Sequence, residues 1–284
     1  MSSMVVPAAA GIGALLALTA AASAETLTER GFYLVTTVMA CGNCHTPAGP
    51  AGPDQSRFLA GGLTFDEKPF TVTAPNITSD TATGLGDWSD AEIKAALVDG
   101  VRRDGTPLAP VMPSAFYKVL SPRDLDAIVA YLRTVPPIEN SVPGPEYREV
   151  IEAKPLPGAE KPIPESARNG DVLVEGFYLT TIAHCMECHT RWTDGHPDPI
   201  EGLGAGGREF PGPWGVSVAS NITPDPEAGI GAWSDAEVKK AITDGLAPDG
   251  TMLKPPMGYA YYHGMLDGDV DAIVAYLRTI PARK

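Results

Sequence analysis

Cysteine is scarce in this chain of 284 residues, and all four cysteines fall inside two short motifs. None remains for a structural disulfide or for a separate thiolate ligand. Positive charge is also low, with 21 Lys and Arg against 35 Asp and Glu, and the net charge is -14. This balance argues against nucleic acid and anionic membrane surfaces as partners and favours proteins with basic docking faces. Residues 146–284 carry more of the negative charge (net -9) than residues 25–145 (net -5).

Long apolar runs are rare too, and the only one covers residues 5–22. It ends at the small residues Ala22-Ser23-Ala24, directly before Glu25, which is typical of a secretory cleavage site. The run is preceded by no Lys or Arg, so an uncleaved membrane anchor is the alternative. We predict a signal peptide over residues 1–24 and a mature protein in the periplasm, with no membrane span after cleavage.

Two motifs contain the cysteines: Cys41-Gly42-Asn43-Cys44-His45 and Cys185-Met186-Glu187-Cys188-His189. C-x-x-C-H is the attachment signature of c-type haem. Two thiols at this spacing add to the two vinyl groups of one porphyrin, and the next side chain, an imidazole, can bind the iron.

The motifs therefore predict two covalently bound haem c groups. Their attachment residues are Cys41, Cys44, Cys185 and Cys188, and their proximal iron ligands are His45 and His189. A redox dithiol and a four-cysteine zinc site are the alternatives. Neither alternative explains a histidine directly after each second cysteine.

The chain contains a tandem repeat at an offset of 145 residues, which falls to 144 at the haem signatures. Residues 88–100 match residues 233–245 at 9 of 13 positions, and residues 126–136 match residues 271–281 at 10 of 11. A repeat of this length indicates a duplicated domain rather than a solenoid. We predict cytochrome c-type domains over residues 25–137 and 170–284, joined by a proline-rich connector over residues 138–169.

Each unit reads as an all-α, loop-rich domain, since Gly and Pro together make up 58 residues. First helices are expected over residues 27–39 and 172–183, where Gly31 and Gly176 would permit a close helix crossing. Further helices are expected after Ser89 and Ser234, each followed three residues later by Glu in a capping box. Ser121 is the expected cap of the last helix of the first unit, and Asp267 or a residue near it is the expected cap in the second.

Methionine supplies the candidate distal ligands. Met112 and Met257 occupy matching places in proline-rich loops, 67 and 68 residues after the proximal histidines. A thioether is a weak, soft ligand, so a loop stiffened by proline suits it. The alternative is that both methionines only fill the core. No downstream histidine is repeated, and His184, His196 and His263 are expected at the surface or in packing roles.

The chain resembles dihaem cytochromes c, in particular the cytochrome c subunits of periplasmic alcohol, aldehyde and gluconate dehydrogenases. The resemblance rests on motifs present in both units: Gly-Phe-Tyr-Leu at 31–34 and 176–179, the haem signatures, Asn-Ile-Thr at 76–78 and 221–223, Trp-Ser-Asp at 88–90 and 233–235, Met112 and Met257, and Tyr-Leu-Arg at 131–133 and 276–278. The repeated Asn-Ile-Thr is expected to form a structural turn that braces the haem pocket, although it also fits the glycosylation pattern.

The resemblance implies a subunit that takes electrons from a dehydrogenase and passes them to ubiquinone or a terminal cytochrome. Two filled axial positions leave no open site for substrate, so we expect an electron carrier rather than an enzyme. A dihaem peroxidase or thiosulfate-oxidising enzyme with one displaceable ligand is the alternative, and a haem-based ligand sensor is a third.

Overall fold

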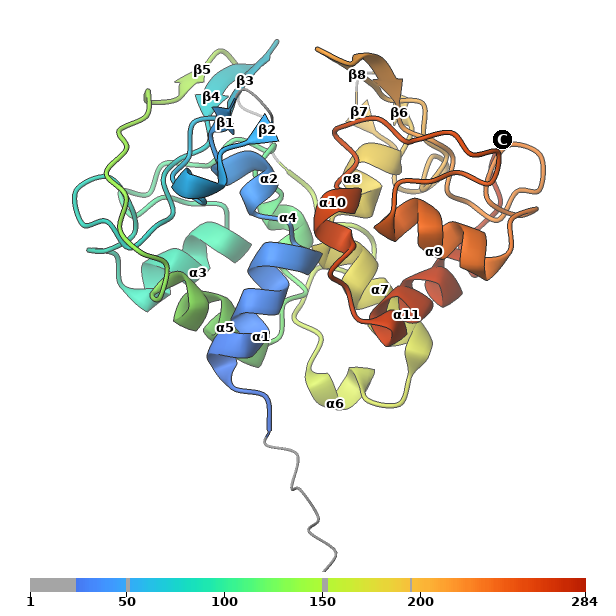
Figure 1. Ribbon diagram of the computed structural model, residues 1–284, viewed down its shortest axis with the longest axis horizontal. Helices are drawn as coiled ribbons and strands as arrows, with labels where there is room; N and C mark the ends of the chain where they lie inside the picture. The colour runs from blue at the N-terminus through green and yellow to red at the C-terminus, as the bar shows by residue number, and fades with distance from the viewer. Residues whose placement is uncertain (1–23, 50–51, 150–152, 195) are drawn as a thin grey trace, which may run out of the picture.

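The computed structural model describes residues 24–49, 52–149, 153–194 and 196–284. The predicted signal peptide therefore lies almost wholly outside the described residues. Figure 1 shows two units side by side, the first coloured blue to green and the second yellow to red, with the strands gathered at one end. No helix of the described part is long and apolar enough to cross a membrane.

The elements of the first unit are α1 (Leu27–Tyr33), η1 (Leu34–Val38), α2 (Gly42–His45), β1 (Ala48–Gly49), β2 (Gly52–Pro53), η2 (Gln55–Arg57), β3 (Thr64–Glu67), β4 (Phe70–Thr73), α3 (Asp90–Val98), α4 (Ser114–Tyr117) and α5 (Pro122–Leu132). The connector contributes β5 (Glu146–Tyr147) and α6 (Glu165–Arg168). The second unit contains α7 (Val172–Ile182), α8 (Cys185–His189), β6 (Trp192–Thr193), β7 (His196–Pro197), β8 (Glu209–Gly212), β9 (Gly215–Val218), α9 (Asp235–Thr243), α10 (Tyr259–Tyr262) and α11 (Asp267–Leu277).

The all-α prediction is wrong, because the described residues also form four small antiparallel sheets. Their order is β1-β2, β3-β4-β5, β6-β7 and β8-β9. These strands are two to four residues long, and a run that short does not show the alternating pattern by which strands are recognised. The loops rich in glycine and proline, which were expected to be irregular, therefore also form tight β-hairpins.

The first helix of each unit leads into the haem signature, and it was predicted in both units. In the first unit the helix ends in a π-helical turn, η1, where the Met39 N–H donates to the Leu34 carbonyl across five residues (2.8 Å). In the second unit the Ala183 N–H donates to the Leu179 carbonyl across four residues (2.9 Å). A π-turn absorbs one extra residue in a helix. It explains why the repeat offset changes from 145 to 144 at this place.

The expected close crossing is present at Gly31 and Gly176. A β-carbon on Gly31 would lie 1.9 Å from the Ala127 carbonyl oxygen, and one on Gly176 would lie 2.0 Å from that of Ala272. Helix α1 therefore lies directly against α5, and α7 against α11, at a distance that only glycine allows.

Both predicted capping boxes are confirmed. Ser89 accepts from the Glu92 N–H while the Glu92 carboxylate accepts from the Ser89 N–H, and Ser234 and Glu237 repeat the arrangement. The last helix of the second unit begins where it was expected, but Leu266, next to Asp267, is the N-cap of α11 and Asp267 is its first residue.

A contact between the units lies at this N-cap. The Leu266 N–H donates to the phenolic oxygen of Tyr33 in the first unit (3.1 Å), and Tyr33 donates to Asp269 (2.6 Å). The same contact exists in reverse, because the Ser121 N–H donates to Tyr178 (3.3 Å), which donates to Asp124 (2.6 Å). Each unit thus places a tyrosine hydroxyl at the start of the last helix of the other unit, where it accepts from the N–H of the N-cap residue.

The packing follows the same symmetry. Helix α4 of the first unit packs against α7 of the second, and α10 of the second packs against η1 of the first. In Figure 1 both short helices lie between the two units. The units therefore meet through equivalent faces, as in a two-fold dimer.

Charge breaks this symmetry at Asp124, which is fully buried. Arg30 donates to its carboxylate (2.8 Å), and so does Arg168 of α6 (3.2 Å). Arg168 also binds Glu175 (2.9 Å), which stands in the second unit where Arg30 stands in the first. Burial alone would raise the pKa of Asp124, but the hydrogen bond and charge of Arg30 outweigh it and hold the pKa below its usual value.

We predict that Asp124→Asn destabilises the protein strongly, whereas Asp269→Asn has a much smaller effect. Removing one partner of a buried ion pair costs roughly 3 kcal/mol or more. The pKa of Asp124 is lower in the folded protein than in the unfolded chain, so its ionised carboxylate stabilises the fold at pH values above the unfolded-state pKa. This stabilisation is lost as the pH falls through the folded-state pKa. Denaturant unfolding at pH 7 and near pH 3 checks both points, because the gap between wild type and Asp124→Asn should narrow in acid. Equal losses of unfolding free energy in Asp124→Asn and Asp269→Asn would contradict the special role given to Asp124.

Candidate cofactor sites

Each haem signature forms a short helix after a left-handed residue. Ala40 (φ 47) precedes Cys41 and α2, and His184 (φ 44) precedes Cys185 and α8. This sharp reversal turns the chain from the end of the first helix into the signature. Within α2 the His45 N–H donates to the Cys41 carbonyl (3.0 Å), so one turn carries both cysteines and the histidine.

The two histidine rings are held in the same way. His45 Nδ1 lies 2.8 Å from the Pro75 carbonyl oxygen, and His189 Nδ1 lies 2.6 Å from that of Ser220. A carbonyl can only accept, so Nδ1 carries the proton and Nε2 keeps its lone pair for a metal. Burial lowers the pKa of both imidazoles, against a smaller opposite effect of these hydrogen bonds. Both rings are therefore neutral at neutral pH, which is the form that binds iron.

The carbonyl that holds each ring is followed by the repeated Asn-Ile-Thr. Asn76 accepts from the Thr78 N–H (2.9 Å) and donates to the Ile138 carbonyl (2.6 Å). Asn221 accepts from the Thr223 N–H (2.8 Å) and donates to the Arg283 carbonyl (2.7 Å). The predicted structural turn is confirmed, and it ties the histidine-holding loop to the chain that follows the last helix of each unit.

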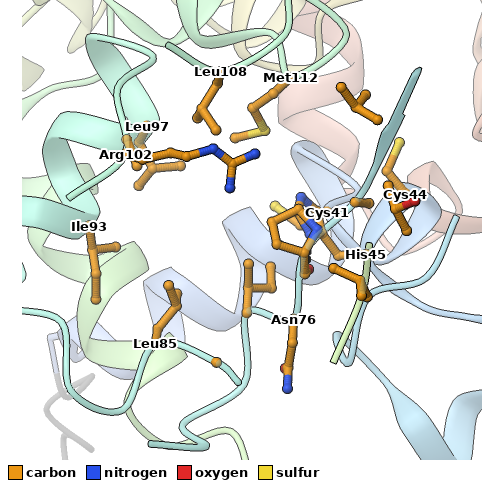
Figure 2. A pocket seen from close by; sticks show the side chains of 18 of the residues that line it. Cys41, Cys44, His45, Asn76, Leu85, Ile93, Leu97, Arg102, Leu108 and Met112 are labelled. Atoms are coloured by element: carbon orange, nitrogen blue, oxygen red, sulfur yellow. Dashed lines mark hydrogen bonds between the residues drawn. The ribbon is translucent and has the colours of Figure 1, made fainter. Parts of the chain in front are cut away.

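The first cavity brings together the predicted site residues of the first unit. It has a volume of about 560 Å³ and is lined by Cys41, Cys44, His45 and Met112. Figure 2 shows His45 and Met112 reaching it from two different segments of the chain. Much of its remaining wall is apolar: Ile77, Leu85, Trp88, Ile93, Leu97 and Leu108.

The second cavity repeats this arrangement in the second unit. Its volume is about 380 Å³, and Cys185, Cys188, His189 and Met257 line it. Ala40 and Asn43 of the first unit also line it, so the first signature helix reaches the wall of the second cavity. The two sites are therefore neighbours across the interface.

The predicted residues suit a flat, largely apolar macrocycle that carries an iron. Each cavity has two thiols, an imidazole with a free Nε2, a thioether and an apolar wall, which together match the donor set of a haem c with His and Met ligands. The cavities bring these groups together, while ligation by Met112 and Met257 stays a prediction.

The alternatives to haem find less support. Burial raises the pKa of all four thiols to about 12, whereas a redox dithiol needs a thiol with a lowered pKa. Within the described ranges, no group of three or more His, Cys, Asp or Glu side chains is placed to hold a metal ion. A four-cysteine zinc site is therefore not formed by these residues.

Of the remaining histidines, His184 lines the second cavity next to Cys185, whereas His196 and His263 line neither cavity. His184 Nδ1 lies 3.1 Å from Glu187 and its ring meets Tyr117 edge-on, while exposed His263 contacts Asp244 (3.1 Å). His196 is exposed on β7.

The sequence reasoning missed Arg102. Figure 2 shows its guanidinium inside the first cavity, and its buried Nε has no hydrogen-bond partner among the described residues. The corresponding residue of the second unit is Ala247. The two units therefore differ at this aligned position, which carries arginine in the first unit and alanine in the second. This difference, ten residues before the candidate distal ligand Met112, was the signal that could have revealed Arg102.

Comparison with known proteins decides the family. The Cytochrome c family model matches residues 28–136. A protein of Cereibacter sphaeroides named diheme cytochrome c-type is 30% identical over 262 residues, which cover 85% of this chain and 82% of that protein. This chain belongs to the cytochrome c family. It is a c-type cytochrome with covalently bound haem c, and its role is electron transfer.

Other relatives are subunits of larger enzymes. The fructose dehydrogenase cytochrome subunit of Gluconobacter japonicus is 31% identical over 268 residues, 90% of this chain and 53% of that subunit. The gluconate 2-dehydrogenase cytochrome c subunit of Pantoea cypripedii is 29% identical over 282 residues, 91% of this chain and 60% of that subunit. The chain thus spans between half and three fifths of the length of these two cytochromes.

We predict two haems per chain, one for each signature. Replacing Cys41 and Cys44 together with alanine should remove one covalently bound haem, and replacing Cys185 and Cys188 should remove the other. Mass spectrometry of the denatured protein and haem staining after denaturing electrophoresis check this count. A wild-type chain that carries a single haem would contradict it.

Proposed function

We propose that this cytochrome is a periplasmic dihaem electron carrier in which His and Met fill both axial positions of each iron. The observation that carries the proposal is that each of two neighbouring cavities contains an attachment signature and the matching methionine. The periplasmic location is supported by the signal-like segment at residues 1–24 and by the secreted setting in which haem c is attached.

The protein residues have separate roles in this proposal. The cysteines anchor the cofactor, and the backbone carbonyls of Pro75 and Ser220 orient the proximal imidazoles. The haem supplies a one-electron change at its iron. The apolar walls exclude water and so favour the less charged, reduced state.

Met112 is presented by a turn that the chain fixes locally. The Met112 N–H donates to the Ala109 carbonyl (2.9 Å), and the Ser114 N–H donates to the Met112 carbonyl (2.7 Å). Pro110 and Pro113 flank this turn. A ligand held by a stiff loop stays in place when the iron changes charge, which keeps reorganisation small and suits electron transfer.

We predict that Met112→Ala and Met257→Ala each open one distal position. Each variant should lose part of the far-red sulfur-to-iron absorption of the oxidised protein and gain rapid carbon monoxide binding at one reduced haem. Met252→Ala is the matched control, because Met252 also lines the second cavity but is 55% exposed and has no methionine mate in the first unit. Rapid carbon monoxide binding by the wild type would contradict filled distal positions and would favour the haem-based ligand sensor instead.

The neighbouring positions of the two cavities support transfer between the sites inside one chain. Ala40 and Asn43 flank the first attachment site and also line the second cavity. An electron that enters at one site therefore has a short route through packed protein to the other. The donor is proposed to be a dehydrogenase, as the names of the relatives suggest, and the acceptor a respiratory quinone or cytochrome.

The two sites are not electrostatically equal. Arg102 projects into the first cavity, and its place in the second unit is taken by an alanine. A positive guanidinium in this cavity would pair with an acidic group of the cofactor and would stabilise the reduced iron, since reduction removes one positive charge. This raises the reduction potential of the first site.

We therefore predict that Arg102→Gln lowers the potential of one haem and leaves the other unchanged. The expected shift is about 60 mV, which corresponds to roughly a tenfold change in a one-electron equilibrium. A spectroelectrochemical titration that resolves two waves measures it. Lys68→Gln is the control, since it removes the same charge from the same unit at a side chain that is 90% exposed and does not line the cavity. Two unchanged waves in Arg102→Gln would rule out the role given to this arginine.

A further inference from the structure

The two haem signatures differ in charge at one position. Asn43 lies inside the first signature and lines the second cavity. At the offset of 144 that relates the signatures, Asn43 corresponds to Glu187. The duplication thus places a neutral amide in one signature helix and a carboxylate in the other.

Glu187 is linked to the walls of both cavities through His184. Glu187 Oε2 lies 3.1 Å from His184 Nδ1, and His184 lines the second cavity. The His184 ring meets the Tyr117 ring edge-on, with 6.5 Å between the ring centroids. Tyr117 is buried and lines the first cavity. Three side chains in contact therefore lead from the carboxylate to both sites.

The charge of Glu187 acts on an attachment cysteine of each site. Burial raises the pKa of Cys44 to about 12, and the charge of Glu187 adds to this effect. Burial also raises the pKa of Cys188 to about 12, again with a contribution from Glu187. Both sulfurs are attachment points for the porphyrin, so a charge that acts on both lies near both cofactors.

A cation opposes Glu187 at the second site. The guanidinium of Arg208 lies 4.9 Å from the ring centroids of both Trp192 and Phe210, and its Nη1 lies 3.5 Å from the Glu187 carbonyl oxygen. Its charge lowers the pKa of Cys188, against the larger effects of burial and Glu187. The corresponding residue of the first unit is Leu63. The second signature therefore has a cation that the first lacks at this position.

The position of the carboxylate gives its charge weight in the redox equilibrium. Reduction of a haem removes one positive charge from its iron, so a nearby carboxylate stabilises the oxidised state. The Glu187 side chain is only 20% exposed. A partly buried charge is screened less by water and salt than an exposed one.

We propose that the Glu187 carboxylate controls both haem sites at once and lowers the reduction potential of each. Arg208 offsets part of this effect at the second site. Arg102, in contrast, acts on the first site alone. The inference rests on the proposed electron-transfer function and names a residue that sets the potentials of the pair together.

The test is a spectroelectrochemical titration of the full haem-loaded protein. Glu187→Gln removes the charge and keeps a polar side chain of the same size beside His184. Both waves should move to higher potential, with about a threefold change in each one-electron equilibrium, which is roughly 30 mV. Glu187→Asp keeps the charge and should leave both waves close to those of the wild type.

Glu227→Gln is the matched control, because it removes the same charge from the same unit at a side chain that is 77% exposed and lines neither cavity. Neither wave should move in this variant. Arg208→Gln should lower one wave more than the other, which identifies the wave of the second site.

A Glu187→Gln protein in which neither wave or only one wave moves would overturn the shared control. An equal shift in Glu187→Asp would also overturn it, because packing rather than charge would then be the cause. If Glu187→Gln did not retain both haems, Asn43→Asp would decide: a carboxylate at the equivalent position should lower both waves, and two unchanged waves would contradict the proposal.

Failure of the proposed function has a different readout. Rapid carbon monoxide binding by the wild type would contradict a carrier with filled axial positions. The shift of both waves in Glu187→Gln would still be measurable in that case.

Discussion

The hydrogen bond from each proximal imidazole to a backbone carbonyl is the constraint on which both sites depend. It fixes the proton on Nδ1 and aims Nε2 into the cavity. The carbonyl belongs to a turn that Asn76 or Asn221 holds, and each asparagine also binds the chain after the last helix of its unit. A ligand on the signature helix is therefore positioned by chain segments that lie about 30 and 90 residues further on.

Contacts between residues close together in the chain could be predicted from the sequence, whereas contacts between residues far apart in the chain could not. Capping boxes at Ser89 and Ser234 are local and were predicted correctly. The repeat exposed the matched cysteines, histidines and methionines because duplication places equivalent residues at a fixed offset. The strands were missed because none exceeds four residues. The contact at the start of α11 could not be read from the sequence, because Tyr33, which accepts from the Leu266 N–H, lies 233 residues away from it.

Duplication gives the molecule an approximate two-fold axis, and each departure from that symmetry has a physical role. The buried carboxylate of Asp124 binds two arginines, and one of them, Arg168, also binds Glu175 and so ties α6 of the connector to both units. Arg102 distinguishes the electrostatics of the first cavity from those of the second. Equivalent faces thus join the units, while unequal charges and walls give the two sites different properties.

The π-helical turn of the first unit shows how a duplicated protein can change length without losing its geometry. Gly31 precedes Cys41 by ten residues, whereas Gly176 precedes Cys185 by nine. The surplus residue widens one turn of helix, so the helix crossing before it and the cysteine pair after it both keep their places. The extra residue at this point therefore leaves the packing on either side of it unchanged. A sequence search that requires a fixed number of residues between the glycine and the haem signature would overlook one of the two copies.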